Sequence, residues 1–296
     1  MLIVIPTKDR PKELRNTLNF LSLNIFFFKK VVVVDSSNLK NKNVIKKEIN
    51  NYNFDISVVD SKPSTCIQRN IGFNFLKDHE FIMFLDDDNI FYPDAFSKMQ
   101  QFLNNNNEFA GVAFNQIYYD KKNILEKIKR NIFFSNFGIY NYKNGEFSKS
   151  GWQSKFINFN EDTIVQWLPT RAVIYKSNLI KNIRFDENFG IYGYLEDLDF
   201  SLELKKRGNL MVCSRAKYTH DQTIIRSGFA FGKKEIKNRY YIVKKHNLSK
   251  TLFFLTSFLR AILTFKNFIF GDLNSGKRLL GNLVGLINLN KLDKKI

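Results

Sequence analysis

The stretch Phe81-Ile82-Met83-Phe84-Leu85-Asp86-Asp87-Asp88 decides the fold, because it joins an apolar strand to three consecutive acids. Three earlier apolar runs have the same form: Leu2–Ile5 ends at Pro6, Val31–Val34 at Asp35 and Ile56–Val59 at Asp60. The four valines form a continuous apolar run, which is typical of a strand buried on both faces of a parallel sheet. Helical patterns over 12–23 and 65–77 alternate with these strands. The order predicts an α/β fold with a mostly parallel central sheet and right-handed crossovers.

Polar residues follow each predicted strand, and the carboxyl ends of parallel strands meet at one edge of a sheet. Asp35 or Asp60 alone would be an ordinary turn residue. Asp86 and Asp88 are different, since alternation along an extended chain places both on the same side. Two such carboxylates can hold Mg²⁺ or Mn²⁺, which accepts phosphate oxygens as further ligands. The alternative is a solvated acidic turn.

A second acidic cluster, Glu196-Asp197-Leu198-Asp199, lies more than a hundred residues later. It follows a loop rich in glycine and tyrosine and opens a helical pattern that ends near Gly208. Acidic side chains stabilise the start of a helix, which could account for Glu196 or Asp199. That explanation leaves the glycine- and tyrosine-rich loop unexplained.

The composition excludes several classes of protein. The chain has 296 residues, of which 44% are apolar and 25% charged, so it is neither disordered nor fibrous. Two cysteines, Cys66 and Cys213, cannot build a disulfide framework, and no CxxC pair predicts zinc, which favours a reducing compartment. The amino-terminal residues predict a first strand and not a signal peptide.

The net charge of +18 is concentrated in the last third of the chain. Residues 205–296 carry a net charge of +16, whereas residues 1–204 carry +2. Such asymmetry predicts a polyanionic partner, either nucleic acid or an anionic membrane surface. A general bias toward lysine in the source proteome would not explain the uneven placement.

Five segments in this order resemble family 2 glycosyltransferases, which have the GT-A nucleotide-diphospho-sugar transferase fold. They are Ile3–Arg10 (IVIPTKDR), Val32–Ser37 (VVVDSS), Gln68–Gly72 (QRNIG), Phe84–Asp88 (FLDDD, a DxD motif) and Tyr194–Asp199 (YLEDLD, an ED motif). Phe185-Asp186-Glu187 stands where the family often has FDE. The basic flank Arg239–His246 is similar to bacterial members that build surface polysaccharides, including rhamnosyltransferase-like ones. The QxxRW motif of processive members is absent, which argues for transfer of one sugar or a few.

The resemblance implies a GT-A Rossmann-like α/β/α sandwich over residues 1–246 and a C-terminal helical extension over 247–296. It further implies an inverting, metal-dependent transfer from a nucleotide-diphosphate sugar to a saccharide or lipid-linked hydroxyl, in surface polysaccharide or glycolipid synthesis. Asp197 would be the catalytic base, Glu196 would bind the acceptor, and Asp35 would accept a hydrogen bond from the nucleobase. The remaining expected site residues are, for Mg²⁺ or Mn²⁺, Asp86, Asp88 and His220, and for the donor nucleotide, Pro6, Thr7, Arg10, Asp35, Arg69, Asp86 and Asp87.

The segment Thr251–Phe270 is long enough to span a bilayer, but Arg260 and Lys266 near its middle argue against a span. Thr256, Arg260, Thr264 and Asn267 recur at spacings of four, four and three, which predicts a helix with one polar stripe. Beside the lysine-rich segment 233–245, such a helix is expected to lie in the interface of an anionic membrane. It could instead pack against the catalytic domain or a second subunit. A second, shorter helix is expected at Leu279–Leu289.

Two rival functions remain at this stage. A non-enzymatic nucleic-acid binder would use the basic segment on phosphates, but it would not need two acidic clusters that repel phosphate. A sugar-nucleotidyltransferase with the same sheet would show a glycine-rich loop after the first strand, and Thr7-Lys8-Asp9-Arg10 has no glycine. We therefore expect a cytoplasmic transferase at the inner face of the membrane, with no nucleic-acid partner and with a homo-oligomer as an option.

Overall fold

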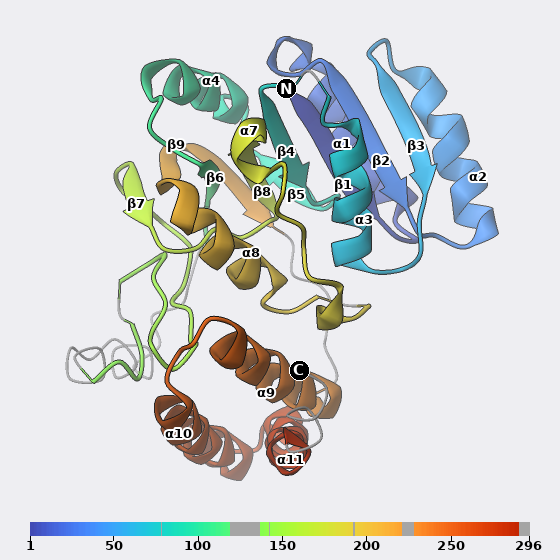
Figure 1. Ribbon diagram of the computed structural model, residues 1–296. Coiled ribbons are helices and arrows are strands. Elements are labelled where there is room, and N and C mark those ends of the chain that lie inside the picture. The colour runs from blue at the N-terminus through green and yellow to red at the C-terminus, as the bar shows by residue number, and fades with distance from the viewer. Residues whose placement is uncertain (78, 119–136, 142, 192, 221–227, 290–296) are drawn as a thin grey trace. The chain divides into compact units, whose positions relative to one another are not determined.

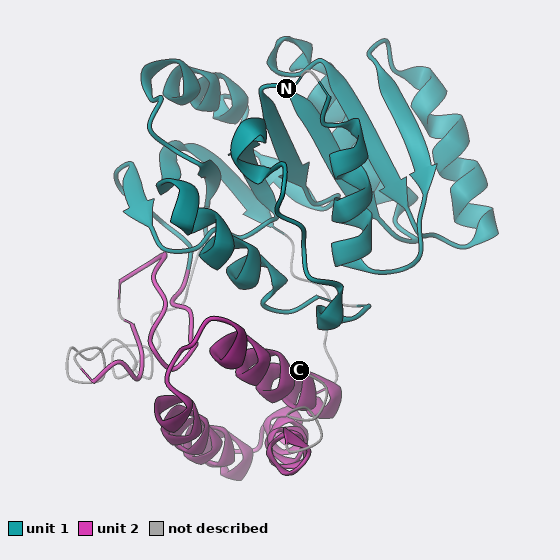
Figure 2. Ribbon diagram, viewed as in Figure 1, with its two compact units in different colours: residues 1–119, 156–221 teal, residues 120–155, 222–296 magenta. Residues whose placement is uncertain are grey.

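The computed structural model describes residues 1–296 except 78, 119–136, 142, 192, 221–227 and 290–296. The chain forms two compact units, shown in separate colours in Figure 2. Unit 1 consists of Met1–Tyr119 and Phe156–Asp221, and unit 2 of Asp120–Lys155 and Gln222–Ile296. This division differs from the boundary expected after His246, since helix α9 (Gly228–Lys245) belongs to unit 2, where it packs against α11 (Leu273–Ile287).

Unit 1 is built on one sheet with the order β3-β2-β1-β4-β8-β6-β9-β5, and β7 pairs with β9 (Figure 1). The four strands expected from the sequence are β1, β2, β3 and β4, and they pair in parallel. The other half is mixed, since β8 is antiparallel to β4 and β6, while β6 and β9 are parallel. The predicted α/β fold is confirmed. The strands are β1 Leu2–Thr7, β2 Lys30–Asp35, β3 Ile56–Asp60, β4 Phe81–Leu85, β5 Asn89–Phe91, β6 Gly111–Gln116, β7 Thr163–Val165, β8 Ala172–Lys176 and β9 Leu210–His220.

The helices of unit 1 begin where local sequence favours it. Pro11 opens α1, a position where its missing N–H costs nothing. The Ser64 hydroxyl accepts a hydrogen bond from the Ile67 amide and caps α3. The predicted helix over 65–77 is shorter than expected, since α3 ends at Gly72 and a 3₁₀ turn follows. The α-helices are α1 Pro11–Ser22, α2 Leu39–Glu48, α3 Thr65–Gly72, α4 Ala95–Asn105, α7 Ser177–Ile180 and α8 Glu196–Leu204, and the 3₁₀ turns are η1 Ile25–Phe27, η2 Ile49–Asn51, η3 Phe73–Phe75, η4 Glu187–Phe189 and η5 Lys205–Arg207.

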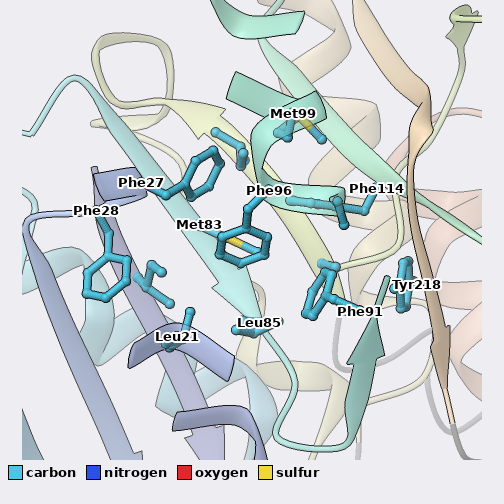
Figure 3. Close-up of a cluster of buried hydrophobic side chains, with 14 of the residues drawn as sticks. Leu21, Phe27, Phe28, Met83, Leu85, Phe91, Phe96, Met99, Phe114 and Tyr218 are labelled. Carbon is cyan, nitrogen blue, oxygen red and sulfur yellow. The ribbon is translucent and has the colours of Figure 1, made fainter. Parts of the chain in front are cut away.

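The core of unit 1 is rich in aromatic rings (Figure 3). The Phe96 ring lies 4.6 Å from that of Phe27, 5.1 Å from Phe91 and 5.5 Å from Phe114, measured between centroids. Tilted and edge-on pairs of this kind add to the stability that apolar burial provides. They connect α4 to strands β5 and β6 of the sheet.

Helix α3 lies very close to strand β1. A Cβ added at Gly72 would come within 2.6 Å of a Val4 methyl group, which is closer than side chains pack, so only glycine fits there. The close approach brings Gln68 over the strand ends, where its amide nitrogen donates to the carbonyls of Thr7 and Val34 at 2.8 Å each. Arg69, the next residue, is thereby held beside the carboxyl end of the sheet.

Unit 2 contains α9 (Gly228–Lys245), α10 (Lys250–Ile269) and α11 (Leu273–Ile287). Both helices expected from the sequence of the extension are present, with α11 starting earlier than predicted. Helices α9 and α11 approach closely through glycines, because a Cβ at Gly232 would collide with the carbonyl oxygen of Arg278. At the same contact Glu235, 1% exposed, accepts from the Arg278 guanidinium at 2.8 Å.

Candidate active site

Strand β4 delivers the three acids to the carboxyl edge of the sheet, next to the ends of β1 and β2. Thr7 of β1 is in register with Asp35 of β2, so both lie at this edge. The turn after β4 is fixed by Arg171, whose carbonyl accepts from the Asp86 amide at 2.8 Å and from Asn89 Nδ2 at 2.6 Å. The backbone that carries the acids is therefore held by the residue that precedes β8, the strand that pairs with β4.

Asp87 faces inward and ties this turn to the first strand and helix. Its Oδ2 accepts a hydrogen bond from the Thr7 hydroxyl at 2.6 Å, and its Oδ1 lies 3.2 Å from Arg10 NH1. The side chain is almost fully buried, and burial raises the pKa of Asp87 to about 7 despite these partners. The middle acid of the three therefore has a positioning role in the structure.

Asp86, Asp88 and His220 form a group that can hold a metal ion, since one ligand atom from each lies within 4.8 Å of the others. Strand β5 pairs with β9 so that Asn89 is opposite His220, which brings the imidazole to the acids. His220 Nε2 is 3.0 Å from Asp88 Oδ1, and Arg10 NH1 is 2.6 Å from Asp88 Oδ2. Burial alone would raise the pKa of Asp88, but His220 and Arg10 outweigh it and hold the pKa below its usual value. Two carboxylates and an imidazole suit Mn²⁺ or Mg²⁺, so the residues fit the expected cation.

The second acidic cluster lies at the same place, and Arg69 joins the two. Its NH2 is 3.3 Å from Asp86 Oδ1, and its NH1 is 2.9 Å from Glu196 Oε1. The Arg69 side chain is only 4% exposed, so this is a buried cation between two carboxylates. Segments that are more than a hundred residues apart in the sequence therefore share one guanidinium.

Asp197 follows Glu196 in the first turn of α8, where its carboxylate accepts from the Leu198 amide at 2.8 Å. Burial, followed by the charge of Glu196, raises the pKa of Asp197 to about 7, although Arg171 and Arg69 act in the opposite direction. A carboxyl group with a pKa near neutrality can accept a proton and release it under ordinary conditions.

The loop before α8 contains glycine where side chains crowd the backbone. A Cβ at Gly193 would lie 2.5 Å from the Glu196 carboxyl carbon and 2.6 Å from the Thr65 hydroxyl, so a larger residue would displace the Glu196 or Thr65 side chain. Leu195 has a left-handed backbone with φ of 74°, a conformation that costs free energy in a residue with a side chain. Glycine and backbone strain both occur where the chain sets the position of the two acids.

Asp35 is fully buried at the end of β2, and only one of its oxygens is hydrogen-bonded. Oδ1 accepts from the Ser37 amide at 2.8 Å, whereas Oδ2 is buried without a hydrogen-bond partner among the described residues. A buried carboxylate oxygen that lacks a donor is costly, unless a ligand supplies one.

The comparison with protein families decides the identity. The model of glycosyl transferase family 2 matches residues 2–167, more than half of the chain. The chain belongs to glycosyl transferase family 2. No curated protein sequence matches it.

Solved structures confirm the GT-A fold of this glycosyltransferase. Residues 1–349 of TarS from S. aureus match with 18% identity and a TM-score of 0.52, over 87% of this chain and 71% of TarS 1–349. The same protein in complex with UDP-GlcNAc matches with 16% identity and a TM-score of 0.52, over 82% and 66% of the two chains. GalNAc-T7 with UDP, GalNAc and Mn²⁺ matches with 12% identity and a TM-score of 0.60, over 82% of this chain and 48% of that one. The glycosyltransferase thus spans about half the length of the GalNAc-T7 chain.

The structure brings together most of the residues that the sequence singled out in this glycosyltransferase. Ion pairs form two sets, one that joins Arg10 and His220 to Asp88 and one that joins Asp86 and Glu196 through Arg69. The two sets meet where ligand atoms of Asp86, Asp88 and His220 lie within 4.8 Å of one another. Asp35 and Thr7 lie at the same sheet edge but are not part of these ion pairs, although the Thr7 hydroxyl reaches Asp87. Pro6 is a residue of β1 that is in register with Val34.

Sequence reasoning missed Arg171. Its guanidinium donates to Gln116 Oε1 at 2.9 Å, and its charge lowers the pKa of both Asp86 and Asp197. A lone arginine before an apolar strand carries no signal of this role. Only the antiparallel pairing of β8 with β4 places it beside the acids.

Proposed function

We propose that this family 2 glycosyltransferase is an inverting, metal-dependent enzyme that moves a sugar from a nucleotide-diphosphate donor to an acceptor hydroxyl. The observation that carries the proposal is the Arg69 bridge from Asp86 to Glu196, which puts the two acidic clusters in one site. One cluster then serves the leaving diphosphate and the other serves the incoming alcohol.

At the donor side, Asp86, Asp88 and His220 would hold Mg²⁺ or Mn²⁺, which offsets the charge that develops on the departing diphosphate. Arg10, now paired with Asp87 and Asp88, adds positive charge where phosphate oxygens would lie. Arg69 supplies a second cation at the same edge. The GalNAc-T7 structure contains UDP and Mn²⁺, which supports this assignment.

The nucleobase would be read at the end of β2. The unpartnered Oδ2 of Asp35 is suited to accept a hydrogen bond from an imide N–H, such as that of a uracil or thymine base. Thr7 and Pro6 end the neighbouring strand β1 and would lie against the base. The TarS structures with UDP and UDP-GlcNAc support a uridine nucleotide as the first donor to test.

At the acceptor side, Asp197 would be the general base that takes the proton from the attacking hydroxyl, while the diphosphate departs from the opposite face of the sugar. Its raised pKa, to about 7, suits a group that must accept a proton in each turnover. Glu196, whose Oε1 is held by Arg69, would position the acceptor through its other oxygen.

The acceptor class and location are part of the proposal. We expect a saccharide or lipid-linked acceptor in surface polysaccharide or glycolipid synthesis, and a cytoplasmic enzyme attached to the inner face of the membrane. The basic segment 205–296, with its net charge of +16, supports attachment to an anionic surface. A homo-oligomer is a further option that a measurement of molar mass would decide.

A hydrolysis screen across UDP, dTDP and GDP sugars tests the reaction without knowledge of the acceptor. We expect release of one nucleoside diphosphate in Mn²⁺ or Mg²⁺ and loss of the activity with a chelator. Asp88→Asn should weaken donor binding, whereas Asp197→Asn should bind donor and fail to turn over. Asp94→Asn is the control, because Asp94 is exposed and pairs only with Lys98 among the described charged residues.

Two results would count against the proposal. Full activity in the presence of a chelator would contradict metal dependence. Undiminished turnover by the Asp197→Asn enzyme would remove Asp197 from the mechanism.

A further inference from the structure

Helix α10 buries three of its hydroxyl side chains in the interior of unit 2 and exposes many of its apolar ones. Thr256 is 0% exposed, Ser257 3% and Thr264 7%. The Arg260 guanidinium on the same side lies over the Trp152 ring, 5.0 Å from its centroid. The polar stripe expected from the sequence therefore faces the protein, except for Asn267, which is exposed.

The opposite side of α10 is apolar and exposed. We call it the outer stripe: it consists of Phe254, Phe258, Ile262, Phe265 and Ile269, at spacings of four, four, three and four, and these side chains are 41–64% exposed together with the adjacent Phe268. A helix that faces water would show the reverse pattern. Exposed apolar surface of this extent marks a site of contact with a partner or a membrane.

The apolar surface continues past the end of the helix. Phe270 is 79% exposed and Leu273, the first residue of α11, is 71% exposed. The chain turns between them at Gly271, whose φ of 96° suits glycine. Two large apolar side chains are therefore presented at a tight corner, where they could enter a lipid layer.

The charge around this surface favours an anionic occupant. Residues 228–289 contain eleven basic and two acidic residues, a net charge of +9. Lys250 and Lys266 of α10 and Lys277 of α11 are exposed beside the apolar residues. A second copy of the same basic surface would be repelled, whereas anionic headgroups would be attracted.

The helix is long and apolar enough to cross a membrane by length and composition, with a mean hydropathy of 1.4 in its most apolar window, of which 22% is buried. Its inner side, however, packs against the rest of unit 2, since Phe253 is fully buried and its ring centroid lies 5.4 Å from that of Tyr240. Helices α9, α10 and α11 all contact one another, as Figure 1 shows. That packing favours a helix lying along a surface over one crossing the bilayer.

We propose that the outer stripe of α10 and the Phe270 corner lie in the interface of an anionic membrane, with the lysines at the headgroups. The inference deepens the proposed function and rests on it only in placing the enzyme near a lipid-linked acceptor. It names the binding surface, which the proposed function leaves open.

Flotation of the full chain with vesicles tests the proposal. The probes are vesicles of phosphatidylcholine alone and vesicles that contain about 30% phosphatidylglycerol. We expect the chain to float with the anionic vesicles, and the Phe258→Ser/Phe270→Ser variant to bind them at least about tenfold more weakly. High salt should weaken the binding of the unmodified chain.

The chain offers a matched control in unit 1. Phe26 and Leu23 are 62% and 80% exposed, against 63% and 79% for Phe258 and Phe270. Phe26→Ser/Leu23→Ser therefore removes apolar side chains of nearly the same exposure, and it should float like the unmodified chain. Circular dichroism of both variants checks that the fold is kept.

Equal flotation of the Phe258→Ser/Phe270→Ser variant and the unmodified chain would overturn the proposal, as would failure of the unmodified chain to float. A dimer in light scattering that only this variant converts to a monomer would assign the surface to a second copy. Flotation needs no nucleotide sugar and the hydrolysis screen needs no membrane, so failure of this inference is distinguishable from failure of the proposed function.

Discussion

Removal of Arg69 should destabilise unit 1 by an amount that depends on pH. The Arg69→Ala variant leaves Asp86 and Glu196 without the cation that they share at 3.3 and 2.9 Å. The guanidinium also lies over the Phe185 ring, 5.5 Å from its centroid. The mutation therefore removes two ion pairs and a cation–π contact from the carboxyl edge of the sheet.

The expected loss is at the lower end of the range for a buried ion pair. Breaking such a pair by removing one partner costs about 3–5 kcal/mol, because a charge is left without compensation. Arg69 is 4% exposed and Glu196 10%, but the Asp86 side chain is 27% exposed and keeps some contact with water. We therefore expect the free energy of unfolding to fall by about 3 kcal/mol.

The loss of unfolding free energy in Arg69→Ala should depend on pH in a definite direction. Burial already raises the pKa of Asp86, and Arg69 is the strongest group that acts against it. Without Arg69 the pKa rises further in the folded state, so the variant binds a proton more readily when folded than when unfolded. Its deficit relative to the unmodified chain should be largest at high pH, where Asp86 is ionised, and should shrink as the pH falls through the raised pKa of Asp86.

Urea unfolding followed by tryptophan fluorescence measures the loss at each pH, and Trp167 is the tryptophan that lies in unit 1. Arg15→Ala is the control, since it removes a comparably short ion pair of 2.6 Å to Glu48 from a side chain that is 53% exposed. That variant should lose far less stability. A loss by Arg69→Ala no greater than that of the control, or one independent of pH, would refute the argument that Arg69 compensates buried charge.

Three further predictions address catalysis, the cation and the helices. Because the pKa of Asp197 is about 7, kcat/KM should fall about tenfold per pH unit below about pH 7 and level off above it, and a flat profile would argue against this base. Asp88→Asn should reduce Mn²⁺ binding in isothermal titration with the circular dichroism unchanged, and His220→Ala should reduce it less, so unchanged binding by Asp88→Asn would place the metal elsewhere. Gly232→Ala should cost about 1–3 kcal/mol in thermal unfolding, because its Cβ meets a backbone carbonyl, whereas Gly276→Ala meets only a movable Phe268 ring and should cost much less.

The parallel half of the fold could be predicted because its signal is local. Each of the four strands β1 to β4 is a short apolar run that ends at a polar residue, and spacing predicts the helices α1 and α3 between them. Helix α2 (Leu39–Glu48) was not predicted. The mixed half could not be predicted in the same way. Strand β8 becomes antiparallel to β4 through pairing between distant segments, and no local pattern specifies which partner a strand will find.

The candidate site also contains residues that could be predicted from local sequence and residues that could not. The two acidic clusters and His220 were visible in the sequence as residue types that can bind a cation or move a proton. Arg171 was not visible, because its position beside Asp86 depends on the strand that carries it. The inward-facing polar side of α10 was also hidden, since periodicity shows that a helix has two sides but not which one the protein covers.

The sequence by itself determined the apolar strands, the acids at their ends and the basic charge of the last third, since these depend on side-chain chemistry and short-range spacing. Only the tertiary structure decided that Arg69 holds Asp86 and Glu196 together and that the Phe258 side of α10 is left uncovered. Both depend on contacts between residues far apart in the chain. Such contacts are selected by the packing of whole elements, in which many weak interactions must be satisfied at once.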